Sequence, residues 1–274
     1  ADLVLHPAFR EDDVKRARDK RLADIAQSQA SPRALASRSL NPILFGPAHP
    51  YGQPGDGLGD ARSVAALTPA SLRAAQGKWL RADNVTITVV GDVTMEQLKP
   101  MLEASFGAWR APAGARPVKA IDAAIPAPQP RIVLIDRPNS PQSVIVAGRV
   151  LPVTGRQQGL EALDLANEVL GNGFLSRLNL NLREDKGWSY GVRSAVRSPK
   201  GPRSLVLTAP VQADRTGDSI ALILADMRAF PKAKGVDATE LTRVTDGNIR
   251  GLPSEFETNG QVLGVVLGNQ LLGR

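Results

Sequence analysis

Proline concentrates in one stretch of this 274-residue chain and divides it into two parts. Residues 111–130 carry prolines among alanines, at Pro112, Pro117, Pro126, Pro128 and Pro130. Proline fixes φ and removes a backbone donor, so this density favours an extended linker over a helix or a paired strand. We therefore predict a first domain over residues 1–112, a linker over 113–130 and a second domain over 131–274, each domain of ordinary size.

The two parts repeat one order of elements, in which a helix is followed by a strand, a turn and another helix. Apolar spacing and capping residues predict helices over 9–29, 39–45, 68–80, 94–106, 157–170, 218–230 and 237–250. Alternating apolar residues predict strands over 84–90, 131–136, 142–150 and 204–211. Because strands come in neighbouring pairs and helices in blocks, the pattern favours an α+β fold.

Composition excludes several classes of protein. The chain is 42% hydrophobic and 22% charged, which is typical of a globular protein. Its net charge of +7 does not indicate nucleic-acid binding, because basic residues alternate with acids and no basic run carries interleaved aromatics. The absence of cysteine excludes disulfides and thiolate metal sites. No apolar run is long enough to span a membrane.

The two ends of the chain indicate a piece of a longer protein. The N-terminus lacks both a methionine and the layout of a signal peptide. The C-terminus stops at Leu271-Leu272-Gly273-Arg274, within an apolar pattern. We therefore expect the first domain to lack its beginning and the second domain to lack its end.

The most informative residues lie in the second part. Arg183 and Tyr190 stand seven residues apart around a Lys186-Gly187 turn. A guanidinium offers a planar fork of donors and a phenol offers one hydroxyl donor, so together they can hold one peptide carbonyl. Donors placed at a reacting carbonyl stabilise the charge that develops there. The competing interpretation is a surface charge beside a half-buried aromatic residue.

This stretch resembles the insulinase-like zinc metallopeptidases of the pitrilysin and processing-peptidase type. The second half of such proteins carries a run similar to "SRL…LRE..G..Y". Two more segments are similar: "GPAHPYGQPGDG" at 46–57 resembles their "G..H.YG.p..G", and "ADNVTITVVGD" at 82–92 resembles their strand "adN..i.vvGd". The resemblance covers nearly the whole chain. It implies two related domains, each a mostly antiparallel sheet with helices on one face, the LuxS/MPP-like metallopeptidase fold.

Metal binding is not expected in this chain. Its only histidines, His6 and His49, are far apart, and no His-x-x-Glu-His motif exists. In the resembling family, zinc-binding members carry glutamates on the helix that matches 9–29, at positions held here by Ala17 and Asp24. Alanine cannot bind a metal, and Asp24 without histidine partners is a solvated helix charge. His49, in a Gly/Pro loop, is expected to be a surface or loop-packing residue.

Nucleophilic and phosphate-binding chemistry lack their motifs. The chain has no cysteine and no Gly-x-Ser-x-Gly elbow. Gly171-Asn172-Gly173 lacks the Gly-Lys-Ser/Thr end of a phosphate loop and follows a predicted helix, so a helix C-cap turn is the better interpretation.

The resemblance implies the zinc-free, substrate-binding half of a metalloendopeptidase that cleaves peptides in a closed chamber. Arg183 and Tyr190 are then its catalytic and substrate-binding residues. Zinc and a glutamate base come from a homologous partner half, on the same chain or another subunit, so this chain alone is inactive. Its partners are that half and a peptide substrate, and its expected location is the periplasm. An edge strand near 142–150 or 204–211 is expected to pair with the substrate backbone.

The alternative is a structural or assembly subunit without proteolytic activity. Core subunits of respiratory complexes use the fold that the resemblance implies. Retention of Arg183 and Tyr190 favours the peptidase role, because a scaffold has no chemical need for that pair.

Overall fold

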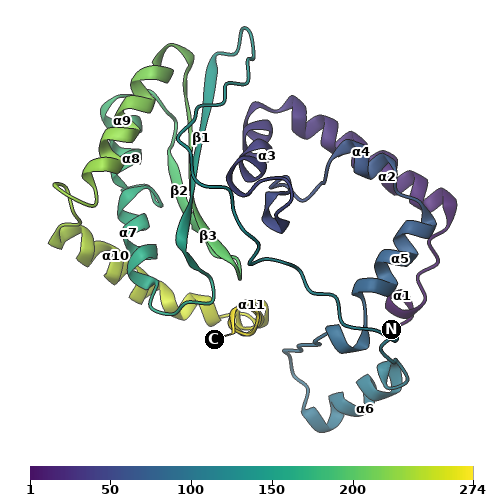
Figure 1. Ribbon diagram of the computed structural model, residues 1–274. Helices are drawn as coiled ribbons and strands as arrows, with labels where there is room; N and C mark the ends of the chain where they lie inside the picture. Colours follow the sequence, from purple (N-terminus) through teal and green to yellow (C-terminus); the bar gives the residue numbers. More distant parts are fainter. Residues whose placement is uncertain (274) are drawn as a thin grey trace. The chain divides into compact units, whose positions relative to one another are not determined.

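The computed structural model describes residues 1–273, which form two compact units (Figure 1). Unit 1 contains residues 1–27, 58–119 and 255–268, and unit 2 contains 28–57, 120–254 and the residues from 269 onward. The boundary between the two units that follows residue 119 falls within the proline-rich stretch 111–130. The segments 28–57 and 255–268, however, belong to the opposite unit from the one that the sequence predicts. The domain boundaries of the intact protein stay a prediction.

Unit 2 is built on a three-stranded antiparallel sheet. Its strands are β1 (Gln142–Thr154), β2 (Arg193–Arg197) and β3 (Pro202–Gln212), in the order β1-β3-β2. The register pairs Gly148 of β1 with Val206 of β3. The predicted strands at 142–150 and 204–211 are therefore confirmed, and β3 is the central strand.

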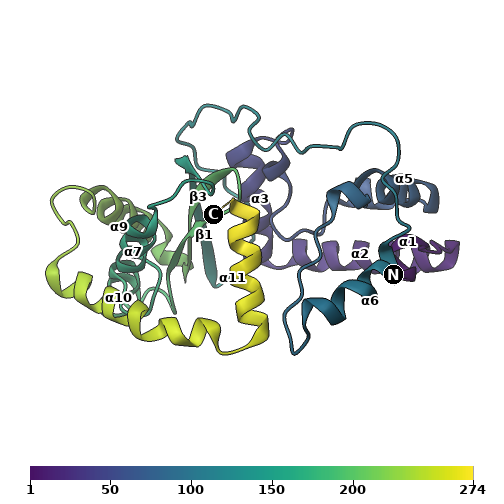
Figure 2. The same ribbon diagram turned by 90° about the horizontal axis from the view of Figure 1, so that it is seen from below.

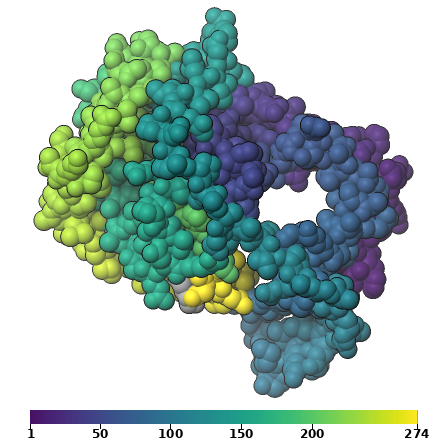
Figure 3. Space-filling model, viewed as in Figure 1, coloured from purple at the N-terminus to yellow at the C-terminus, as the bar shows by residue number. Residues whose placement is uncertain are grey.

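Helices cover both faces of this sheet. Figures 1 and 2 both show α7 (Glu161–Leu170), α9 (Thr216–Ala229) and α10 (Ala238–Gly251) on one face and α3 (Pro32–Phe45) on the other. In the space-filling view, α9 and α10 form the green and yellow-green outer surface of unit 2 (Figure 3). The α+β class is thus confirmed, with one helix more than expected on the second face of the sheet.

A single apolar cluster joins the helices to the sheet in unit 2. Its buried members are Leu170, Leu178, Leu182, Val192, Leu207, Ala209, Val211 and Ile223. Leu207, Ala209 and Val211 alternate along β3, so they face the same side of the sheet. Leu178 and Leu182 are fully buried and come from the short helix α8 (Arg177–Asn179) and the π-helical turn Leu180–Asp185 that continues it.

Glycine lets α3 pack directly on β1. A Cβ added to Gly148 would lie 3.0 Å from the side chain of Leu44 and 3.2 Å from that of Leu40. Both leucines belong to α3, which explains why residues 28–57 join the sheet rather than the other helices of the first predicted domain.

The regular structure of unit 1 is helical among the residues that the structure describes there, and irregular segments connect its helices. Its helices are α1 (Asp2–Leu5), α2 (Glu11–Ala30), α4 (Ala61–Ala65), α5 (Pro69–Trp79), α6 (Met95–Phe106) and α11 (Asn259–Leu272), where α2 and α11 extend into unit 2. Thr68 and Thr94 begin the helices predicted over 68–80 and 94–106, and each caps its helix, α5 or α6, through a capping box. Within residues 1–273, no helix has both the length and the apolar content needed to cross a lipid bilayer.

Two predicted strands are wrong. Residues 85–90 follow a short 3-10 turn and carry no regular structure, and residues 131–136 are also irregular. Their apolar side chains are exposed, including Ile132 at 83% and Leu134 at 87%. A strand is stable only when a partner satisfies its backbone groups, and neither segment has such a partner among the residues described.

We expect Leu182→Ala to lower the free energy of unfolding by about 2–5 kcal/mol, because it removes a fully buried side chain from the cluster on β3. The matched control is Leu241→Ala on α10, where the leucine is exposed and the expected change is within about 0.5 kcal/mol. Urea unfolding of both variants measures the difference. Equal losses would contradict this assignment of the core.

Candidate functional site

The segment that carries Arg183 is anchored by its neighbours in the chain. Leu178 and Leu182 are buried against the sheet, so the helical segment between them cannot rotate freely. Arg183 directly follows Leu182, and its side chain is about one-third exposed. The core leucines therefore fix the direction in which Arg183 leaves the backbone.

A left-handed glycine ends this helical segment. Gly187 has φ +64°, and its N–H donates to the carbonyl of Arg183 at 3.1 Å. The carbonyl of Leu182 accepts from the N–H groups of Trp188 and Ser189, at 3.0 and 3.2 Å. The predicted Lys186-Gly187 turn is thus present, and it reverses the chain back toward Arg183.

Ser189 holds the next residue in place. Its hydroxyl donates to the carbonyl of Pro210 in β3 at 2.5 Å and accepts from the N–H of Gly191 at 3.1 Å. A bridge between Ser189 and Val211 adds a backbone contact to the same strand. Tyr190 therefore projects from a fixed backbone while its side chain stays 84% exposed.

The Arg183 guanidinium contacts two aromatic rings. Its Cζ is 4.4 Å from the ring centroid of Phe174 and 5.3 Å from that of Tyr190, both within cation–π range. Phe174 comes from the turn before α8 and is 59% exposed. We call Phe174, Arg183 and Tyr190 the arginine sandwich.

The arginine sandwich keeps hydrogen-bond donors available. Arg183 Nε lies 3.3 Å from a carboxylate oxygen of Glu184. Among residues 1–273, no hydrogen bond engages the terminal nitrogens of Arg183 or the hydroxyl of Tyr190. The structure thus brings the two predicted residues together as exposed donors, an arrangement that suits an oxygen carrying partial negative charge.

Phe174 was not predicted as part of the site. It stands in a glycine-containing turn, where no helical or strand periodicity assigns it a partner. The available signal was an aromatic residue in a turn directly before the "SRL" run, in a chain with few aromatics. Spacing alone does not link that position to Arg183.

The "SRL" part of the same motif has a different role. Ser176 is fully buried and donates to the carbonyl of Gly173 at 2.7 Å, while Leu178 lies in the core. Arg177 lies against Glu240, and its Nε and one terminal nitrogen donate to the two carboxylate oxygens at 2.6 and 2.5 Å. These three residues build the structure around the sandwich.

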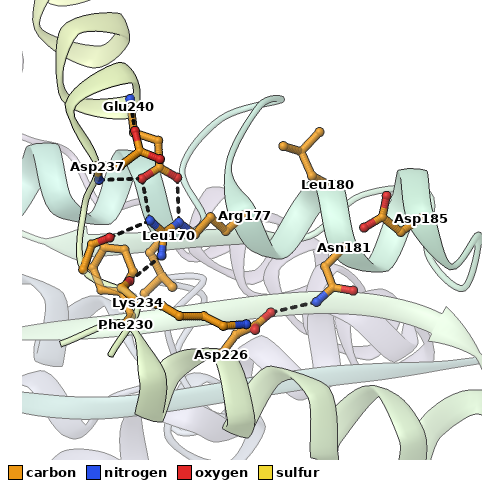
Figure 4. A pocket seen from close by; sticks show the side chains of 11 residues that line it. Leu170, Arg177, Leu180, Asn181, Asp185, Asp226, Phe230, Lys234, Asp237 and Glu240 are labelled. Carbon is orange, nitrogen blue, oxygen red and sulfur yellow. Dashed lines mark hydrogen bonds and ion pairs between the residues drawn. The ribbon is translucent and has the colours of Figure 1, made fainter. Parts of the chain in front are cut away.

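Arg177 also forms a wall of a cavity of about 510 Å³ in unit 2 (Figure 4). Its remaining donors bind the carbonyls of Lys234 and Gly235, and its guanidinium lies 5.3 Å from the ring centroid of Phe230. Each of the three guanidinium nitrogens of Arg177 therefore has a partner within the protein. The contacts tether the loop between α9 and α10 to helix α8.

The Arg177 pair shifts the acid–base behaviour of Glu240. Hydrogen bonds from the guanidinium, reinforced by the N–H of Asp237, hold the pKa of Glu240 below its ordinary value. The same pair raises the pKa of Arg177. Glu240 also accounts for the predicted capping box, because Asp237 and Glu240 cap α10 reciprocally.

The histidines do not form a zinc site. His49 is buried, stacks on Phe45 at 5.4 Å, and accepts at Nδ1 from the N–H of Tyr51 at 3.0 Å, which agrees with the predicted loop-packing role. His6 contacts Asp2, and Asp24 pairs with Lys20. Within residues 1–273, no three potential ligands of the His, Cys, Asp or Glu type gather in one place. The donors present do not fit zinc.

Residues 66–247 match the family model of the peptidase M16 inactive domain. The chain belongs to the peptidase M16 family. This membership confirms the resemblance to insulinase-like zinc metallopeptidases, and the matched segment includes the whole arginine sandwich.

A curated relative and two solved structures are also similar to this chain. The M16 chain is 28% identical over 260 residues to an uncharacterized zinc protease of Mycobacterium tuberculosis, covering 92% of the chain and 56% of that protein. It therefore spans little more than half the length of this relative. Two solved structures share its fold at lower identity.

The first of these structures is a peptidase M16 inactive domain from Pseudomonas fluorescens, with a TM-score of 0.77 and 22% identity over 99% of this chain and 62% of that one. The second is in complex III2 of Candida albicans, with a TM-score of 0.72 and 15% identity over 94% and 61%. At these identities the likeness shows the fold alone.

We expect the Arg177–Glu240 pair to stabilise the M16 chain in a pH-dependent way. Because folding lowers the pKa of Glu240, its contribution is present above the ordinary glutamate pKa and is lost as pH falls through the lowered value. Glu240→Gln should cost roughly 2 kcal/mol at neutral pH and nothing in strong acid.

The control for this prediction is Glu257→Gln, which changes an exposed glutamate in the same way. Urea unfolding as a function of pH measures both variants. A wild-type advantage over Glu240→Gln that persists unchanged into strong acid would rule out the ion pair as its source.

Proposed function

We propose that this chain is the zinc-free, substrate-binding half of an M16 metalloendopeptidase that cleaves peptides in a closed chamber in the periplasm. The arginine sandwich is the observation that supports the proposal, because it places the terminal nitrogens of Arg183 and the hydroxyl of Tyr190 side by side on an anchored backbone. In this proposal zinc and the general base belong to a partner half, in keeping with the lack of a cluster of potential ligands among residues 1–273.

The two donors have distinct tasks in this proposal. The Arg183 guanidinium supplies a fixed positive charge, and the Tyr190 hydroxyl supplies a neutral donor that adjusts by rotation. A peptide carbonyl that accepts from both becomes more polarised, and the negative charge that develops on its oxygen during attack is stabilised. One donor of this kind typically contributes about 2.7–4 kcal/mol to the transition state.

The outer edges of this sheet belong to β1 and β2, and the edge of β2 is already in use at Ser194, whose N–H donates to the carbonyl of Gly171 and whose carbonyl accepts from Asn167. β3 is bonded on both sides by β1 and β2, so the expected pairing at 204–211 is wrong. β1 has an outer edge that no strand of the described chain occupies. We therefore assign backbone pairing of the substrate to the edge of residues 142–150.

The alternative function is a structural or assembly subunit. The likeness to the complex III2 chain supports it, because that chain has the same fold. The two functions differ in their need for the sandwich: a scaffold requires the core and the Arg177–Glu240 pair but not the exposed hydroxyl of Tyr190.

We expect the purified chain to hold no stoichiometric zinc. Its two histidines lie apart, and the ligand types of the described residues do not cluster. Metal analysis after dialysis against a weak chelator and then zinc-containing buffer measures the content per chain. About one tightly held zinc per chain would overturn the assignment to the zinc-free half.

We expect Tyr190→Phe to lower kcat/KM of the complete enzyme by roughly 100- to 1000-fold, because it removes one donor at the carbonyl. Arg183→Lys should also lower it, since an ammonium does not reproduce the guanidinium fork. The melting temperature should stay near wild type for Tyr190→Phe, because the lost hydroxyl is exposed and unpaired.

The other tyrosine supplies a matched control. The hydroxyl of Tyr51 accepts from the N–H of Gly201 at 3.0 Å. Tyr51→Phe should therefore reduce stability by about 1 kcal/mol and leave turnover unchanged. If Tyr190→Phe instead leaves both kcat/KM and the melt unchanged, the peptidase proposal fails and the scaffold function takes its place.

A further inference from the structure

The two rings of the arginine sandwich come from different segments of the chain. Phe174 lies in the turn before α8, and Tyr190 follows the Lys186-Gly187 turn. Both side chains are largely exposed, so core packing does not hold the rings at their spacing. Some other contact has to connect the two segments.

One buried side chain connects them. Asn179 is only 4% exposed. Its Nδ2 donates to the carbonyl of Phe174 at 2.7 Å, and its Oδ1 accepts from the N–H of Val192 at 3.0 Å. A single amide thus joins the backbone of the Phe174 turn to the backbone two residues beyond Tyr190.

Asn179 is also close in the chain to Arg183, which carries the positive charge of the site. Asn179 precedes Arg183 by four residues on one helical segment, so the two residues lie about one turn apart. The segment that carries Arg183 is therefore also the one from which Asn179 reaches the backbone near both rings.

The chemistry of the side chain matches this task. The two backbone groups require one donor and one acceptor from the same short side chain, which asparagine supplies. Aspartate offers no donor when ionised, and an apolar residue would leave both backbone groups buried without a partner.

We propose that Asn179 is a positioning residue, which holds Phe174 and Tyr190 against Arg183 and thereby aims both donors at the substrate carbonyl. The catalytic part of this inference rests on the proposed function. The geometric part, that Asn179 sets the position of the Tyr190 ring, does not.

The test variant is Asn179→Asp. It keeps the acceptor for Val192 and replaces the donor to Phe174 with an oxygen that repels the carbonyl. The matched control is Asn181→Ala on the same segment, since Asn181 bonds to Asp226 of α9 and touches neither ring. A second test variant, Phe174→Leu, removes one ring of the sandwich at an exposed position.

The first measurement is a spectrum of the chain labelled with ¹³C in tyrosine. The chain contains two tyrosines, so Tyr51 serves as an internal reference for Tyr190. Asn179→Asp and Phe174→Leu should shift the Tyr190 signal and leave that of Tyr51 in place, whereas Asn181→Ala should shift neither.

The second measurement is turnover of the complete enzyme. Asn179→Asp should lower kcat on the order of 100-fold with KM nearly unchanged, because a misdirected donor still allows binding. Phe174→Leu should lower kcat in the same direction, and Asn181→Ala should have no effect.

The outcomes separate this inference from the proposed function. If Tyr190→Phe lowers kcat while folded Asn179→Asp does not, the inference is overturned and the proposed function stands. If Tyr190→Phe has no effect, the proposed function is overturned, and the Tyr190 signal alone decides whether Asn179 positions the ring. If Asn179→Asp does not fold, Asn179→Ser, which lacks the amide but introduces no charge, decides by the same two measurements.

Discussion

The packing of Leu182 on β3 is the contact on which the candidate site depends. Its side chain is buried in the core, and its carbonyl receives the N–H groups of Trp188 and Ser189. Arg183 directly follows Leu182 in the chain, and Tyr190 directly follows Ser189, whose N–H is bonded to Leu182. One residue therefore sets the backbone on both sides of the site, so a change in the core moves both donors together.

The residues of the most specific sequence motif have two different roles: some hold the fold together, and others present donors at the candidate site. Ser176, Arg177 and Leu178 point into the protein and are satisfied there, by a carbonyl, a carboxylate and the apolar cluster. Arg183 and Tyr190 point outward. Seen from the sequence, all five belong to one run. The fold separates them because a helical segment turns successive side chains to different sides.

Local rules predicted the parts of the fold whose partners lie close in the chain. The boxes that cap α5, α6 and α10 are each contained within a few residues, and the three predicted helices begin at them. The box of α5, in which Ser71 is the partner of Thr68, adds to the predicted N-cap. The strand predictions at 85–90 and 131–136 were wrong because a strand needs a hydrogen-bonded partner strand. An alternating pattern shows which residues could form a strand but does not show whether a partner strand is present. Phe174 and Asn179 were not predicted as site residues for a related reason. Their contacts join segments on either side of a turn, and residue spacing does not show such contacts.

The two rings around Arg183 have a consequence for binding energetics. A free arginine side chain populates many rotamers, and ordering it costs roughly 2 kcal/mol. In this fold, stacking on Phe174 and Tyr190 already restricts those rotamers before any ligand arrives. A ligand that accepts from the guanidinium therefore meets a preorganised donor, and the entropy lost on association comes mainly from the ligand.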